Sequence, residues 1–141
     1  MSRTRLLGVD YGDVRIGLAV TDPDRKIAFP LAVHARAGEQ RDADYFRALV
    51  EEHEIAGIVV GLPLHSGGEE GQKAREARAF GQWLQEATGL PVVYFDERFT
   101  TVHAESALWQ AGLSHKQRQR RRDKVAAQMI LQAYLEGGGQ G

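Results

Sequence analysis

The stretch that decides the fold is LLGVDYGDVRIGLAV, residues 6–20. An apolar run ends at Asp10, and a second apolar run, Ile16–Val20, follows the short segment YGDV. Two β-rich runs joined by four residues predict an antiparallel hairpin, with strands over residues 5–10 and 15–21. The first strand therefore ends on a carboxylate, with the returning strand beside it.

The rest of the chain alternates between strand and helix patterns. Residues 27–35 predict a third strand, in which Pro30 favours an edge position because proline cannot donate to a neighbouring strand. The short apolar run GIVVG, 57–61, is typical of a strand covered on both faces. We further expect helices over 41–53, 72–87, about 101–111, and from the N-cap Ser114 to about 136, with a last strand over 90–95.

This order predicts an α/β domain with a mixed five-stranded sheet, three antiparallel strands and then two parallel ones, flanked by helices. We expect one domain over residues 1–136 and a disordered Gly-rich tail over 137–141. Ligands of such sheets bind at the carboxyl ends of the parallel strands. Asp10 and the pair Asp96–Glu97 lie at two such ends, and the strand between them ends in Gly61, which leaves room.

The composition excludes several classes of protein. No apolar run approaches the roughly 20 residues that cross a bilayer, and the apolar segment near the start is too short for a signal peptide. The chain has no cysteine, which excludes disulfides, thiolate metal sites and a cysteine nucleophile. We therefore expect a cytoplasmic protein that does not bind membranes.

The net charge of −1 points to no partner, but one segment is strongly basic. KQRQRRRDK, residues 116–124, has six basic side chains and one acid, which is typical either of a phosphate-binding surface or of a solvated helix face. At helical spacing Lys116 and Arg120 share the face of Asp123, whereas Arg118 and Arg121 point outward.

Asp123 begins the apolar stripe that continues through Ala127, Ile130 and Tyr134. A carboxylate that faces the sheet is costly unless it is paired, hydrogen-bonded or bound to a metal, so an ion pair with a neighbouring arginine is one alternative. Asp10 could equally start an Asx turn, and Asp96 or Glu97 could cap a helix. Three acids on one rim beside a basic helix favour Mg²⁺ or Mn²⁺ and phosphodiester hydrolysis.

Four blocks of sequence together resemble the RuvX (YqgF) family of the RNase H-like superfamily: GVDYGDVRIGLAVTD at 8–22, IVVGLPLHSGGEEG at 58–71, FDERFTT at 95–101 and DKVAAQMILQAYL at 123–135. The resemblance implies an RNase H-like fold and a metal-dependent nuclease that processes pre-16S rRNA or resolves Holliday junctions. It implies Asp10, Glu97 and Asp123 as the catalytic, metal-binding acids, with Asp96 adjacent to Glu97. Relatives more usually have Asn and Asp where this chain has His65 and Gly67.

We expect the nucleic acid to be contacted by residues around these acids. Arg15 lies in the first block, and Arg98 follows Glu97. Thr100 and Thr101 follow Arg98 and either cap a helix or donate to a phosphate. The remaining candidates are the basic residues Lys116, Arg118, Arg120 and Arg121.

Two other readings compete with a nuclease. Actin-like ATPases and sugar kinases also begin with a strand, an acid, a Gly-containing turn and a returning strand, but they need a second such half that 141 residues do not supply. A catalytically silent nucleic-acid-binding protein would gain nothing from three converging carboxylates. Backbone contacts carry no sequence information, so only the resemblance favours pre-rRNA over branched DNA. A resolvase would need a homodimer to cut two symmetric strands.

Overall fold

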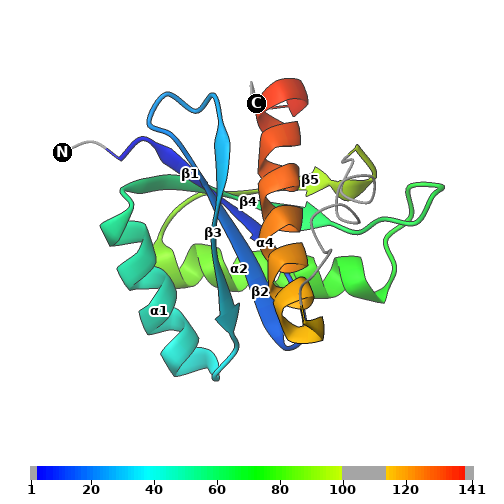
Figure 1. Cartoon of the computed structure of the whole chain (residues 1–141), viewed down its shortest axis with the longest axis horizontal. Helices are drawn as coiled ribbons and strands as arrows, with labels where there is room; N and C mark the ends of the chain where they lie inside the picture. The colour runs from blue at the N-terminus through cyan, green and yellow to red at the C-terminus, as the bar shows by residue number, and fades with distance from the viewer. Residues whose placement is uncertain (1–2, 100–113, 139–141) are drawn as a thin grey trace.

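The structure of the whole chain is a computed structural model (Figure 1). The structure describes residues 3–99 and 114–138, and the side chains of these residues except those of 99, 115–121 and 138. The helix predicted over about 101–111 lies outside the described residues, as do Thr100 and Thr101.

Five strands form one mixed sheet in the order β3-β2-β1-β4-β5. They are β1 (Arg5–Asp10), β2 (Arg15–Thr21), β3 (Ala28–Ala35), β4 (Ile55–Leu62) and β5 (Val92–Asp96). β1 pairs antiparallel with β2 and parallel with β4, β2 pairs antiparallel with β3, and β4 pairs parallel with β5. The predicted mixed sheet and its hairpin with loop 11–14 are thus confirmed.

Helices cover both faces of the sheet (Figure 1). α1 (Glu39–Glu52) and α2 (Gln72–Thr88) pack on one face, and α4 (His115–Ala133) packs on the other. A π-helical turn, Tyr134–Gly138, extends α4. The first two residues of the tail expected over 137–141 therefore belong to this turn, and the other three lie outside the described residues.

Alternation along the strands assigns each side chain to a face. In β1, Leu7 and Val9 belong to the core beneath α1 and α2, whereas Leu6 belongs to the core beneath α4. Successive side chains of a strand point to opposite faces, so Asp10 ends β1 on the side of α4. β4 lies at the centre of the parallel part and is almost entirely buried, as its continuous apolar run predicts.

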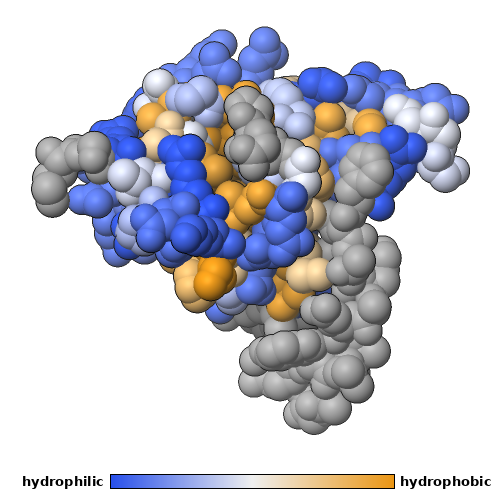
Figure 2. Space-filling model, turned by 90° about the horizontal axis from the view of Figure 1, so that it is seen from above, coloured by the Kyte–Doolittle hydropathy of each residue, from blue (hydrophilic) through white to orange (hydrophobic). Residues whose placement is uncertain are grey.

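The predicted edge position of β3 is also confirmed, because β3 stands at one end of the strand order, next to β2. Pro30 pairs with Ala19 where the register of the two strands shifts, a place at which a missing backbone donor does least harm. The view from above shows hydrophobic residues between larger hydrophilic areas (Figure 2). Among the described residues, the exposed large hydrophobic side chains are Val14, Ile27, Phe29 and Val93. No described helix has the length and apolar character needed to cross a membrane.

Candidate nuclease site

A small acidic hollow of about 250 Å³ lies where β1 and β5 end. Asp10, the last residue of β1, lines it together with Glu97, the first residue after β5. The loop between β1 and β2 contributes Tyr11, Gly12 and Asp13, and Pro63 and Lys73 complete the wall. The carboxyl ends of these strands therefore bring two of the three predicted acids together, as the topology implies.

Gly61 in β4 creates the space that Glu97 occupies. A Cβ atom at Gly61 would lie 2.8 Å from Oε2 of Glu97 and 2.6 Å from Cδ1 of Ile130, both too close for carbon. The expectation that this glycine leaves room is therefore confirmed, although what fills the room is the acid itself. The same contact places Glu97 on the side of the sheet that α4 covers.

Gly17 performs the corresponding task for Asp123. It pairs with Asp10 across the hairpin, and a Cβ atom there would lie 2.1 Å from the backbone oxygen of Asp123. Only glycine permits α4 to approach β2 so closely. The absence of a side chain at Gly17 thus lets α4 pack closely against β2, and this packing brings Asp123 near Asp10.

The buried environment changes how two of these acids titrate. Burial, reinforced by the nearby charges of Glu97 and Asp123, raises the pKa of Asp10 from 3.8 to about 7. Burial and the charge of Asp96 raise the pKa of Glu97 from 4.5 to about 7. The folded protein therefore holds ionised carboxylates here at a cost, which is the electrostatic signature of a site that a cation would stabilise.

Asp123 itself faces an arginine. Its Oδ2 accepts a hydrogen bond from Nε of Arg15 at 3.0 Å, and both side chains are partly buried. The sequence left open an ion pair with a neighbouring arginine, and the arginine found comes from β2. Within residues 3–99 and 114–138, no three acidic, histidine or cysteine side chains are arranged to hold a metal ion.

Asp96 has a different role from Glu97. Its carboxylate accepts hydrogen bonds from the backbone and side chain of Arg98, which hold the pKa of Asp96 below its usual range. Arg98 also donates from Nη1 to the backbone oxygen of Ser66 at 2.9 Å. The pair Asp96–Arg98 therefore connects the end of β5 to the Gly-rich loop 63–71, and Glu97 is the acid that reaches the hollow.

Sequence reasoning missed Lys73, which lines the hollow beside Asp10 and Glu97. Its Nζ lies 3.1 Å from Oδ2 of Asp13. The sequence could have indicated Lys73 by its position in the first turn of the helix after β4, because that turn lies at the same rim as the carboxyl ends of the strands. The candidate contacts Lys116, Arg118, Arg120 and Arg121 lie on α4, but their side chains are outside the described part of the structure.

The sequence model of a family described as "RuvX: Holliday junction resolvase" matches residues 4–137. The chain belongs to the RuvX family. A RuvX relative from Rhodopirellula baltica, named "Putative pre-16S rRNA nuclease", is 49% identical over 132 residues, which cover 94% of this chain and 76% of the relative. A relative of the same name from Syntrophomonas wolfei is 43% identical over 97% of both chains.

One solved structure has a fold similar to that of this RuvX chain. RuvC from T. thermophilus, in complex with a Holliday junction substrate, superposes with a TM-score of 0.59 over 96% of both chains at 15% identity. At that identity the likeness concerns the fold alone. The family and fold expected from the four sequence blocks are thereby confirmed, and the chain is a member of a nuclease family.

Proposed function

We propose that this protein is a divalent-metal-dependent nuclease that hydrolyses a phosphodiester bond of precursor 16S rRNA in the cytoplasm. The observation that carries the proposal is the convergence of Asp10 and Glu97, two acids of raised pKa, in one hollow within electrostatic reach of Asp123. The name that the two relatives share supports precursor 16S rRNA as the substrate.

The donor set fits Mg²⁺ or Mn²⁺, which prefer carboxylate oxygens. Asp10 and Glu97 would hold the cation, and Asp123 is the third candidate ligand because its charge already acts on Asp10. Arg15 keeps the carboxylate of Asp123 at the edge of the site. A bound divalent cation would supply an activated water and stabilise the leaving oxygen.

The chain's own cations would position the substrate. Lys73 is the cation that lines the hollow among the described residues, so it is suited to hold the phosphate that is cleaved. The basic run of α4 includes Asp123 and would hold flanking phosphates on the 3′ or 5′ side. These contacts involve the backbone, and they orient the strand without reading its sequence.

A Holliday junction is the second candidate substrate, because the family model carries that description. A junction resolvase must cut two symmetric strands, so this alternative requires a homodimer. An rRNA nuclease can act as a monomer.

The deciding experiment is cleavage of a 5′-extended 16S rRNA precursor and of a four-way DNA junction, side by side, with Mg²⁺, Mn²⁺ or EDTA. We expect cleavage of the RNA with metal and none in EDTA. Asp10→Asn and Glu97→Gln should abolish it, and Asp24→Asn, at an exposed acid of the β2–β3 turn that does not line the hollow, should not. Cleavage of the junction alone would reverse the choice of substrate, and cleavage in EDTA would exclude the metal mechanism.

A further inference from the structure

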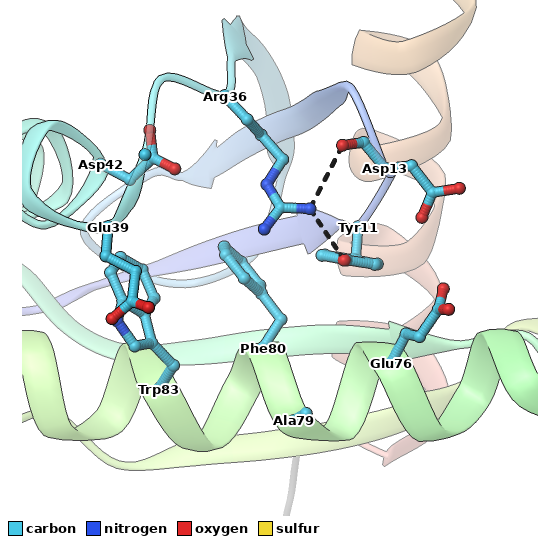
Figure 3. A pocket seen from close by; sticks show the side chains of 10 residues that line it. Tyr11, Asp13, Arg36, Glu39, Asp42, Glu76, Ala79, Phe80 and Trp83 are labelled. Carbon is cyan, nitrogen blue, oxygen red and sulfur yellow. Dashed lines mark hydrogen bonds between the residues drawn. The ribbon is translucent and has the colours of Figure 1, made fainter.

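A second and larger pocket lies on the other face of the sheet. It has a volume of about 750 Å³ and is formed by α2, the start of α1, the segment after β3 and the loop between β1 and β2 (Figure 3). The roles proposed for Asp10, Glu97, Asp123 and the basic run of α4 do not explain this second pocket. It shares Tyr11 and Asp13 with the acidic hollow, so the two pockets adjoin across the β1–β2 loop.

The walls of this pocket are aromatic. Phe80 and Trp83 of α2 stack with their ring centroids 5.5 Å apart, and the ring of Tyr11 lies 5.0 Å from that of Phe80. Phe80 is almost completely buried, whereas Tyr11 and Trp83 keep part of their surface exposed to the pocket. Partly exposed aromatic rings beside a phosphate-binding site are the usual platform for stacking bases of a single strand.

Arg36 is held above these rings. Its guanidinium lies 5.1 Å from the ring centroid of Tyr11 and 5.8 Å from that of Phe80. All hydrogen bonds of the guanidinium to described residues leave from Nη1. They go to the hydroxyl of Tyr11 and the backbone oxygen of Asp13 (Figure 3), and to the backbone oxygen of Gly12. Nε and Nη2 therefore retain donors that a ligand in the pocket could use.

Two of the four acids that line the pocket have a lysine or histidine partner. Asp13 pairs with Lys73, and Asp42 accepts hydrogen bonds from the backbone of Ala37 and lies 2.7 Å from Nε2 of His34. What remains is Glu39, which is exposed at the pocket, and Glu76, whose Oε1 has no hydrogen-bond partner. The pocket thus offers aromatic surface, a cationic donor and carboxylate acceptors.

We propose that this pocket binds an unpaired purine base of the substrate strand, next to the nucleotide whose phosphate lies at Asp10 and Glu97. A purine is flat enough to stack on Tyr11 and Trp83, its ring nitrogen and exocyclic oxygen suit an arginine donor, and its amino group suits a carboxylate acceptor. The base is neutral, so the acids do not repel it, and the phosphates remain outside beside Lys73. This assignment rests on the proposed nuclease function for its strand, but its test does not require cleavage.

The test uses single-stranded RNAs that carry one 2-aminopurine at successive positions, bound in EDTA so that no cleavage occurs. We expect a fluorescence change from stacking at one position. Arg36→Gln and Glu39→Gln should weaken binding about fivefold or more and remove that change, and an abasic site at the same position should have the same effect. Arg41→Gln, an exposed α1 arginine that does not line the pocket, is the matched control and should bind as the wild type does.

A second readout uses the pocket without RNA. In a Trp109→Phe background Trp83 is the only tryptophan, and GMP should quench its fluorescence in a manner that Arg36→Gln weakens. Quenching by a tri-arginine peptide and not by GMP would overturn the proposal in favour of a basic protein segment. Equal affinity for GMP and the oligonucleotide would overturn the proposal that the pocket binds a base of the substrate RNA strand.

The failure of this inference is separable from that of the proposed function. Normal cleavage with no position-specific 2-aminopurine signal would overturn the base pocket and leave the nuclease intact. A wild-type protein that fails to cleave but shows both fluorescence signals would retain the pocket and lose the proposed activity.

Discussion

The side chain of Arg15 donates a hydrogen bond to Asp123, and this bond joins the hairpin strand β2 to α4 beside Asp10. A partly exposed ion pair contributes about 0–1 kcal/mol to stability. The charge of Asp123 also helps to raise the pKa of the buried Asp10, so removing that charge relieves a repulsion as well as breaking the pair. We therefore expect Asp123→Asn to lower nuclease activity by orders of magnitude while the melting temperature without metal stays equal or rises.

A structural role for the ion pair predicts the opposite. Arg15→Gln serves as the control, because it removes the same pair without removing an acid. If the pair were structural, both variants would melt at clearly lower temperature and Asp123→Asn would still cleave. Thermal unfolding in EDTA, together with the cleavage assay, separates the two outcomes.

Asp10 should make the stability of the metal-free protein depend on pH. Its pKa is about 7 in the folded protein and 3.8 as the ordinary value, so between these values the folded state binds more protons than the unfolded state. Stability contributed by the protonated acid is then fully present below about pH 4 and is lost as the pH rises through about 7. Asp10→Asn, which does not titrate, should match the wild type near pH 4 and exceed its stability at pH 8 by a few kcal/mol. Urea unfolding at several pH values in EDTA measures this difference, and a difference that is constant with pH would contradict it.

The hairpin, the order of the strands and the acid at the end of β1 could all be predicted from the sequence, since alternation, turn length and right-handed crossovers determine them locally. The partner of Asp123 could not. Arg15 and Asp123 are 108 residues apart, and only the close approach of α4 to Gly17 brings them together. The choice between Asp96 and Glu97 likewise depends on which of two adjacent residues turns toward Gly61, and no local pattern encodes that turn.

Gly61→Ala should impair the site more than the fold. The added Cβ would press on Oε2 of Glu97 and on Cδ1 of Ile130, which are ends of flexible side chains, so overpacking should cost about 1–3 kcal/mol. Displacing Glu97 should lower activity about tenfold or more, because a shift of about 1 Å in a catalytic group costs about two orders of magnitude. Gly57→Ala, at the other end of β4 with its nearest contact at 3.3 Å, is the control and should cleave normally. Equal activity in the two variants would show that Glu97 needs no space at Gly61.

Arg98→Lys should loosen the Gly-rich loop. Lysine keeps the charge but cannot hold Asp96 and the backbone oxygen of Ser66 at once, because it lacks the planar fork. We expect faster amide exchange over residues 65–71 and reduced cleavage, with little change in melting temperature. Arg25→Lys, at an exposed arginine of the β2–β3 turn, controls for the substitution itself. Unchanged amide exchange over residues 65–71 together with full activity would show that the planar side chain of Arg98 is not needed to hold the loop.

The basic run of α4 should determine how strongly RNA binding depends on salt. Each arginine that contacts a phosphate releases counterions, so Arg118→Ala with Arg121→Ala should reduce the slope of log K against log salt by about 1.4 to 1.8. The loss should be the same for unrelated sequences, because phosphate contacts carry no sequence information. Arg41→Ala with Arg47→Ala on α1 removes the same charge from the opposite face of the sheet and should leave the slope nearly unchanged. Equal slopes for the two double variants would identify the run as a solvated helix face, and binding measured by fluorescence anisotropy from low to moderate salt distinguishes these results.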